Sequence, residues 1–203
     1  TLSLFSGAGG LDIGFVKAGF NIVASVELQK EFCNTLEANI GKYYTKKHKI
    51  ICKDISQFNP KEELDTEIDF IIGGPPCQSF SAAGRRAGGV YGINDVRGSL
   101  FWEYCRIITE LKPKGFLFEN VRGILQSNSK KDWDFILKSF SELGYKIKFR
   151  VMDAADYGVP QHRERLVIVG NNTKNDYFFP RPTHGPDSVT KINHVSVYEA
   201  FKE

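Results

Sequence analysis

Short apolar runs alternate with segments of helical periodicity along most of the chain, and this alternation restricts the possible folds more than any other feature. Apolar residues recur at helical spacing over residues 100–111 and 133–143, and Gly144 follows where a helix C-cap is expected. Strands that are apolar throughout indicate a parallel sheet covered on both faces. The sequence therefore predicts an α/β fold with a Rossmann-like, doubly wound, mostly parallel sheet and helices on both faces. The expected strands are Leu2–Phe5, Ile22–Glu27, Ile50–Lys53, Phe70–Ile72, Phe116–Phe118, Lys146–Met152 and Leu166–Val169.

The length and composition suit one globular domain. The chain has 203 residues, of which 41% are hydrophobic and 25% charged. No run of about eighteen apolar residues is present, so we expect no membrane span. No signal peptide is visible, although the chain begins at Thr1 without Met. The net charge of +3 is compatible with a nucleic-acid partner but is too small to indicate one.

The cysteines do not have the spacing of metal ligands. Cys33, Cys52, Cys77 and Cys105 form no C-x-x-C pair, so no zinc or other metal site is predicted. Reduced thiols in a cytoplasmic protein are the simpler interpretation. We expect Cys33, Cys52 and Cys105 to be small buried hydrophobic residues.

The segment "FSGAGGLD" follows the first expected strand and predicts a ligand site. A dinucleotide fingerprint would need glycines at positions 7, 9 and 12, whereas the sequence has Gly7, Gly9 and Asp12. A carboxylate in this turn would also be a poor neighbour for a pyrophosphate. An NAD-dependent oxidoreductase is therefore disfavoured. The pattern favours a ligand with an adenosine and no phosphate, such as S-adenosyl-L-methionine.

Carboxylates follow the next two strands. Glu27 can accept hydrogen bonds from both ribose hydroxyls, and Leu28 can form an apolar wall for the adenine. Asp54 can accept from the adenine amino group, with Ile55 packed on the ring. Each has a structural alternative: the glycines can form a plain turn, Glu27 can be a solvated cap, and Asp54 can N-cap a helical turn.

The segment "IIGGPPCQSFS" ends the fourth expected strand with a cysteine directly after two prolines. Pro75 and Pro76 restrict the backbone, so the thiol of Cys77 is aimed by a stiff approach. The carboxyl edge of an open α/β sheet is where active sites lie. The sequence therefore predicts Cys77 as a nucleophile.

Charged residues near the fifth and seventh strands belong to the same edge. Glu119 follows the fifth strand, while Arg163 and Arg165 precede the seventh and share one face of an extended segment. Two guanidiniums in one cleft suit a carbonyl oxygen, a phosphate or a thiolate. The alternative is a surface Arg–Glu network through Glu164.

Five blocks together resemble the C5-cytosine DNA methyltransferases. They are "LFSGAGGLDIGF", "GGPPCQSFS", "DVRGSLF", "FENVRGI" and "PQHRERLVIVG", in this order from Thr1 to about Gly170. The resemblance implies the S-adenosylmethionine-dependent methyltransferase fold. It also implies S-adenosyl-L-methionine as methyl donor, S-adenosyl-L-homocysteine as product, and a flipped-out cytosine in double-stranded DNA as substrate.

The resemblance also implies the site residues. Catalysis is expected from Cys77, Glu119, Asn120, Arg163 and Arg165. Cofactor binding is expected from Phe5, Ser6, Gly7, Gly9, Gly10, Leu11, Glu27, Leu28, Asp54, Ile55, Pro76 and Leu100. DNA contacts are expected from Gln78, Ser81, Arg85, Arg86 and Arg97, although arginines in such a loop are more often only solvated.

The expected roles follow from the chemistry of cytosine, whose C5 is a poor nucleophile. Addition of the Cys77 thiolate at C6 makes C5 reactive, and Glu119 would serve N3. Arg165, with Arg163, would stabilise O2 and the thiolate. Asn120 would order Pro76 and the thiol loop. Residues 79–98 would form a glycine-rich lid over the base.

Members of this family continue into a variable target-recognition region and a final block that packs beside the first glycine turn. Residues 1–170 are therefore expected to form the catalytic and cofactor-binding domain, and 171–203 the start of the connection to a recognition region absent from this chain. That region would lie in the full-length chain or a second subunit, and residues 1–203 alone should bind DNA weakly. The segment "VSVYEAFKE" has the pattern of a helix start.

The expected activity is that of a DNA cytosine-5 methyltransferase of a bacterial restriction–modification system, cytoplasmic or nucleoid-associated. One alternative is the tRNA-methylating branch of the same family. Another is a catalytically silent binding subunit, or one active only with a partner chain. The joint presence of Cys77, Glu119 and Arg165 argues against a silent subunit.

Overall fold

The computed structural model describes residues 1–76, 99–125 and 130–202. These residues form one seven-stranded sheet with the strand order β3-β2-β1-β4-β5-β7-β6. The strands are β1 (Leu2–Leu4), β2 (Ala24–Glu27), β3 (Lys49–Cys52), β4 (Phe70–Gly73), β5 (Gly115–Val121), β6 (Lys146–Asp153) and β7 (Glu164–Asn171). Every expected strand is present, with its ends moved by a few residues.

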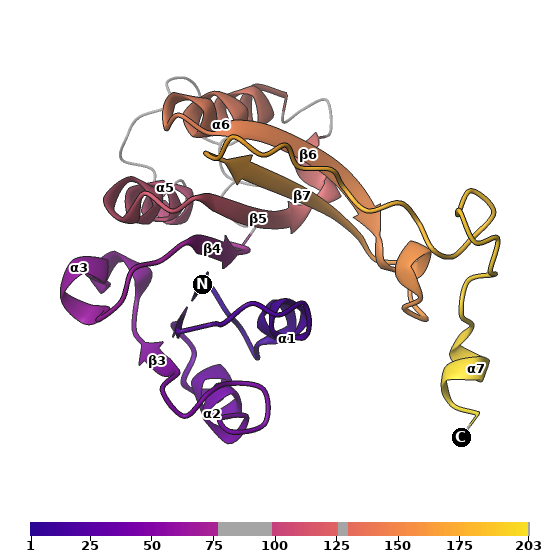
Figure 1. Ribbon diagram of the computed structural model, residues 1–203, viewed down its shortest axis with the longest axis horizontal. Coiled ribbons are helices and arrows are strands. Elements are labelled where there is room, and N and C mark those ends of the chain that lie inside the picture. The colour runs from indigo at the N-terminus through magenta and orange to yellow at the C-terminus, as the bar shows by residue number, and fades with distance from the viewer. Residues whose placement is uncertain (77–98, 126–129, 203) are drawn as a thin grey trace, which may run out of the picture.

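Helices cover both faces of the sheet, as predicted (Figure 1). One face carries α1 (Gly10–Lys17) and α2 (Lys30–Ala38). The other carries α3 (Pro60–Glu63), α5 (Ser99–Leu111) and α6 (Lys130–Glu142). Single turns of 3-10 helix are η1 (Ile55–Gln57), η2 (Arg122–Leu125) and η4 (Ala154–Tyr157), and α7 (Val197–Ala200) lies near the C-terminus. No helix in the described ranges is long and apolar enough to cross a membrane.

One strand, β7, runs opposite to the others in the sheet. Strands β1 to β5 pair in parallel, whereas β7 is antiparallel to both β5 and β6. The first residues of β7 therefore lie at the edge where the parallel strands end. In this register Arg165 is the partner of Val121, two positions beyond Glu119 on β5.

The core between β5 and helices α5 and α6 is aromatic. Phe116 and Phe118 alternate with more exposed residues along β5, so both rings point to the same side. They pack on Phe140 of α6, with ring centroids 4.6 and 5.5 Å apart. Tyr104 of α5 meets Phe118 edge to face and donates its hydroxyl to the carbonyl of Leu117 at 2.9 Å. Such aromatic pairs contribute about 1 kcal/mol each beyond their burial.

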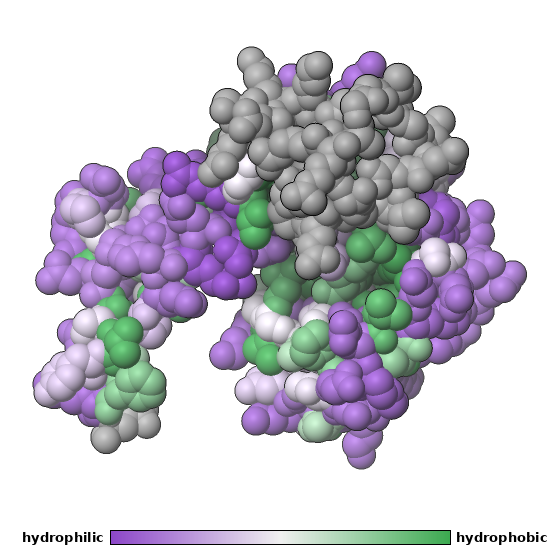
Figure 2. Space-filling model, turned by 180° about the vertical axis from the view of Figure 1, so that it is seen from behind, coloured by the Kyte–Doolittle hydropathy of each residue, from purple (hydrophilic) through white to green (hydrophobic). Residues whose placement is uncertain are grey.

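Residues 171–202 form an arm that begins against β6 and ends away from the body (Figure 1). Lys148 Nζ donates to Asp176 Oδ1 and to the carbonyl of Tyr177, both at 2.6 Å. At the far end a capping box between Ser196 and Glu199 starts α7, in agreement with the predicted helix start. Figure 2 shows hydrophobic surface at this end of the arm; the exposed large apolar residues in α7 and directly after it are Val197, Tyr198 and Phe201.

The cysteine predictions are correct at two of three positions. Cys33 and Cys105 are buried, whereas Cys52 is exposed. Cys52 is the last residue of β3, which is an edge strand, so few neighbouring residues cover its side chain.

Candidate active site

The turn after β1 has an unusual backbone. Phe5, Gly7 and Gly9 have positive φ values of 54°, 54° and 85°. The turn directs the Gly7 N–H onto Glu27 Oε2 at 2.8 Å, and the Gly9 N–H bonds to the carbonyl of Ser6 at 3.0 Å. A left-handed conformation at a bulky residue such as Phe5 is strained, and such strain is concentrated at functional sites.

A buried carboxylate, that of Asp12, holds the turn after β1 in place from inside the protein. Asp12 lies in the first turn of α1 and is inaccessible to solvent. It accepts hydrogen bonds from Ser3 Oγ at 2.5 Å, Ser25 Oγ at 2.8 Å and the Tyr44 hydroxyl at 3.2 Å. Burial, and then the negative charge of Asp12, raise the pKa of Tyr44. The expectation that Asp12 stands in the turn beside a ligand is therefore wrong, because its side chain points into the protein.

A cavity of about 290 Å³ opens beside the turn, at the carboxyl edge of the sheet. Glu27, only 9% exposed, lines it from the end of β2. Its two carboxylate oxygens accept from the N–H groups of Gly7 and Gln29, both at 2.8 Å. These bonds hold the carboxylate in one orientation and leave each oxygen a further lone pair. Glu27 is thus an oriented acceptor rather than a solvated cap.

Asp54 lines the same cavity. Its Oδ1 accepts from Ser56 N at 2.8 Å and Ser56 Oγ at 2.7 Å, which makes it the N-cap of η1. These two hydrogen bonds lower the pKa of Asp54. Its Oδ2 accepts no hydrogen bond within the described part of the chain. The capping alternative is therefore correct, and it leaves one carboxylate oxygen available to a ligand.

The predicted cofactor residues are divided among several places. Those that line this cavity are Phe5, Gly7, Glu27, Leu28, Asp54, Ile55, Pro76 and Leu100. Ser6 is not among the lining residues, and its hydroxyl donates to Ser3 Oγ at 2.9 Å. Gly9 is not among them either, and a Cβ there would collide with Tyr44 and Leu36. Lining residues that sequence reasoning missed are Val26, Gln29, Phe32, Lys53 and Gly74; most of them flank predicted residues in the sequence.

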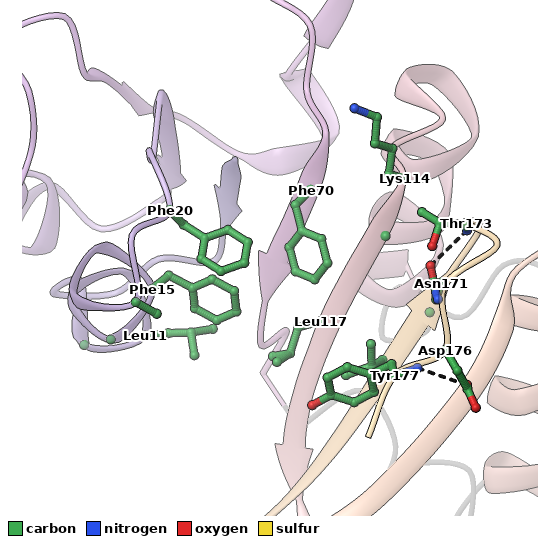
Figure 3. Close-up of a pocket in the computed structure, with 16 residues that line it drawn as sticks. Leu11, Phe15, Phe20, Phe70, Lys114, Leu117, Asn171, Thr173, Asp176 and Tyr177 are labelled. Carbon is green, nitrogen blue, oxygen red and sulfur yellow. Dashed lines mark hydrogen bonds between the residues drawn. The ribbon is translucent and has the colours of Figure 1, made fainter. Parts of the chain in front are cut away.

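Gly10 and Leu11 line a second cavity instead, of about 600 Å³, on the α1 face of the sheet. In Figure 3, Leu11, Phe15 and Phe20 lie on one side, Phe70 and Leu117 in the middle, and Tyr177 beyond them. On this face no described helix lies over β5 and β7, so apolar side chains remain accessible. The sequence did not predict this groove.

An acid and a guanidinium meet where β5 and β7 lie side by side. Glu119 Oε1 is 2.9 Å from Arg165 Nε, and both side chains are about a quarter to a third exposed (31% and 26%). The other carboxylate oxygen of Glu119 lies over Gly74: a Cβ at that position would be 2.8 Å from Glu119 Oε2. The second glycine of "GGPPC" thus leaves the space that the Glu119 carboxylate occupies.

Asn120 connects β5 to the proline segment. It is 2% exposed, and its Nδ2 donates to the carbonyl of Pro75 at 3.2 Å. Its Oδ1 accepts from the N–H of Val121 at 2.8 Å, which holds the amide in place. The contact is with Pro75 rather than with Pro76, the residue expected from the sequence. Predicted residues outside the described ranges are Cys77, Gln78, Ser81, Arg85, Arg86 and Arg97.

The two arginines before β7 differ in their surroundings. Arg165 faces Glu119, whereas the side chain of Arg163 is exposed and forms no ion pair with residues that the structure describes. The backbone N–H of Arg163 donates to Asp153 Oδ1 at 2.8 Å. Glu164 pairs with Arg122 of η2, with a nitrogen–oxygen distance of 2.7 Å. The surface Arg–Glu network exists, but its arginine is Arg122.

Comparison with known proteins agrees with this geometry. Residues 1–200 match the family profile for C-5 cytosine-specific DNA methylase. The chain belongs to this family. Among curated methylases of the family, it is 42% identical over 204 residues to the type II methyltransferase M.AquIA of Picosynechococcus sp., covering 94% of this chain and 79% of the relative.

Other members of the methylase family are longer. The chain is 46% identical over 184 residues to the type II methyltransferase M.FnuDI of Fusobacterium nucleatum, covering 89% of this chain and 50% of the relative. A crystal structure described as a DNA modification methyltransferase from an E. coli prophage aligns with a TM-score of 0.71 and 31% identity, over 98% of this chain and 53% of its own. The chain thus spans about half the length of many related methylases.

Proposed function

We propose that the chain is the catalytic and cofactor-binding part of a DNA (cytosine-5-)-methyltransferase of a type II restriction–modification system. It would transfer a methyl group from S-adenosyl-L-methionine to C5 of a flipped-out cytosine in double-stranded DNA. The observation that carries this proposal is the Glu119–Arg165 pair, which lies over Gly74 at the edge that also holds the Glu27 and Asp54 cavity.

The residues of that cavity fit an adenosine that carries no phosphate. Glu27 offers two oriented oxygens to the ribose hydroxyls, and Asp54 offers Oδ2 to the adenine amino group. The only cation in the described lining is Lys53, whose Nζ is engaged by Glu63 Oε2 at 2.7 Å. Two carboxylates, with no free cation among the described lining residues, would repel a pyrophosphate. Asp12 takes no part in this repulsion, because its carboxylate is turned into the protein.

The bound S-adenosyl-L-methionine supplies an electrophilic methyl group attached to a sulfonium. Cys77, as a thiolate, forms a bond to C6 of the cytosine and so makes C5 nucleophilic. The negative charge that develops across N3 and O2 is met by Glu119 at N3 and by Arg165 at O2. After C5 has gained the methyl group, loss of its proton and cleavage of the C6–sulfur bond restore the aromatic ring and free Cys77.

Arg165 and Asn120 position the catalytic groups. The Arg165 Nε bond to Oε1 fixes the Glu119 carboxylate and leaves Oε2, over Gly74, to meet N3. Asn120 fixes Pro75, two residues before the nucleophile, through a buried hydrogen bond. Arg163 would contribute positive charge nearby. Because C6 is not accessible in a stacked duplex, the cytosine must rotate out of the helix.

Target recognition would reside in the remainder of the protein, either in the full-length chain or in a second subunit. Two observations support this part of the proposal. The chain spans about half of relatives such as M.FnuDI. In addition, the apolar groove beside α1 lies next to the first glycine turn, where the final block of the family is expected to pack (Figure 3).

A trapping experiment tests the enzyme. Duplex DNA containing 5-fluorocytosine cannot lose a proton from C5, so the covalent adduct should persist on denaturing gels in the presence of S-adenosyl-L-methionine. The Cys77→Ser protein should form no adduct. Parallel methylation of plasmid DNA and of total tRNA distinguishes the two branches of the family. Absence of an adduct with the fluorinated duplex, with the C-terminal half supplied, would remove the proposal.

A substitution at Glu119 separates chemistry from cofactor binding. Glu119→Gln keeps the size of the side chain but removes the charge and the proton that serve N3. Methyl transfer should fall by about 100-fold or more, because stabilisation of the developing charge is lost. The affinity for S-adenosyl-L-homocysteine, measured by calorimetry, should change little. An equal loss of both would mean that Glu119 belongs to the cofactor site.

A further inference from the structure

A single arginine on α5 holds the turn that carries Asp54. Arg106 Nη2 donates to the carbonyls of Ile55 at 3.1 Å and Phe58 at 2.9 Å. Its Nε and Nη1 pair with Glu103 at 2.7 Å and Glu110 at 2.8 Å. The guanidinium thus has two carboxylate partners on its own helix and two carbonyl partners on η1.

The carbonyl partners lie at the two ends of η1. Ile55 is the first residue of this turn, and Phe58 is its C-cap. Asp54, the N-cap, and Ile55 both line the cavity assigned to the adenosine. A single 3-10 turn has few internal hydrogen bonds, so its position depends on contacts from outside. Arg106 supplies two of them.

Helix α5 contributes to the same cavity. Leu100 lies in its first turn and lines the cavity together with Ile55. The helix is anchored in the core by Tyr104, which is fully buried. Because Arg106 belongs to this anchored helix, it ties the turn of Asp54 and Ile55 to the element that carries Leu100.

We propose that Arg106 is a positioning residue for adenine recognition: it sets the place of the Asp54 carboxylate relative to the wall formed by α5. This inference rests on the proposed function, since it takes the ligand to be an adenosyl compound. Partly exposed ion pairs contribute little to stability, so the pairs with Glu103 and Glu110 do not by themselves explain an arginine here. A lysine can replace it only in part, because one ammonium lacks the planar fork that reaches both carbonyls and both carboxylates.

The test compares two ligands in calorimetric titrations of the intact protein. S-adenosyl-L-homocysteine presents an amino group to Asp54, whereas S-inosyl-L-homocysteine presents a carbonyl oxygen there. The wild-type protein should therefore prefer the adenosyl compound strongly. Arg106→Met should raise the dissociation constant for S-adenosyl-L-homocysteine about tenfold and leave that for S-inosyl-L-homocysteine nearly unchanged, because only the adenosyl compound uses the positioned carboxylate. The preference ratio should fall about tenfold.

Matched variants separate positioning from stability. The double variant Glu103→Gln and Glu110→Gln removes both ion pairs but keeps the carbonyl contacts, so the ratio should stay at the wild-type value. Arg122→Met removes an arginine paired with Glu164 on another part of the molecule and should also leave the ratio unchanged. Arg106→Lys, which keeps the charge, should give an intermediate ratio, and it carries the test if the methionine variant does not fold.

The results separate a failure of the positioning role of Arg106 from a failure of the methyltransferase proposal. A wild-type ratio in Arg106→Met, or in Arg106→Lys where only that variant folds, would overturn the positioning role and leave the methyltransferase proposal intact. Failure of the wild-type protein to bind either ligand would overturn the proposed function itself. A loss of affinity equal for both ligands would assign Arg106 to general stability of the cavity and would also overturn the inference.

Discussion

At the scale of single residues, the consecutive glycines of "GGPPC" have different neighbours. A Cβ on Gly73 would lie 2.6 Å from the carbonyl oxygen of Leu4 on β1. A Cβ on Gly74 would lie 2.8 Å from Oε2 of Glu119, the end of a flexible side chain, and 3.2 Å from the carbonyl oxygen of Glu119, a tight contact that a small shift relieves. Backbone of a neighbouring strand cannot yield without disrupting the sheet, whereas a side chain can rotate away. The first glycine therefore serves packing and the second serves the site.

This difference predicts opposite results for two alanine substitutions. Gly74→Ala should displace the Glu119 carboxylate and lower methyl transfer about 100-fold, while the thermal midpoint changes by only a few degrees. Gly73→Ala should lower the free energy of unfolding by about 2 kcal/mol through overpacking. Steady-state methylation and thermal melts on both variants check this. An active Gly74→Ala protein would show that the space over Gly74 is not used.

Individual site residues were predictable where chain topology alone placed them. Glu27 ends β2, Asp54 lies two residues after β3, and Glu119 lies in the last half of β5, so they reach the same edge of the sheet. The direction of Asp12 was not predictable, because it depends on hydroxyl donors from β1, β2 and Tyr44, which are distant in sequence. Arg163 and Arg165 are two residues apart, yet only Arg165 has Glu119 as a neighbour.

At the scale of elements, the Asp12 carboxylate joins four segments. Its donors come from β1, from β2 and from the segment after α2, while Asp12 itself is on α1. Ser6 of the glycine turn joins the network through its bond to Ser3 Oγ. A buried carboxylate is tolerated only when its lone pairs are satisfied in this way. The network therefore fixes the turn that brings Gly7 to Glu27.

Removal of this carboxylate should destabilise the protein. Asp12→Ala leaves three buried hydroxyl groups without their acceptor and should lower the free energy of unfolding by about 3 kcal/mol. Asp12→Asn keeps one acceptor oxygen, and hydroxyls can rotate to accept from the amide, so its cost should be about 1 kcal/mol. Urea denaturation followed by circular dichroism measures both. Equal, small costs for the two variants would contradict a structural role for the network.

At the scale of the whole molecule, alternation of strand and helix patterns was sufficient to predict the layered sheet, because burial of both faces demands apolar strands. It was not sufficient to predict the groove over β5 and β7. There Leu117 is as apolar as residues covered by a helix, so the sequence does not distinguish a covered face from an open one. Whether another segment covers this face of β5 and β7 depends on residues elsewhere in the protein.

The cofactor cavity and the proposed target-recognition region belong to different parts of the protein, and this predicts how residues 1–203 behave when produced alone. The residues that line the cavity with Glu27 and Asp54 all belong to residues 1–203, so S-adenosyl-L-homocysteine should still bind. Its dissociation constant should lie within about tenfold of that of an intact methylase of the family. DNA binding should be weak and without preference, because a net charge of +3 provides little attraction to phosphates. Calorimetry measures the first, and selection from a pool of random duplexes measures the second. Enrichment of one sequence by these residues alone would show that the target is read within this part of the protein.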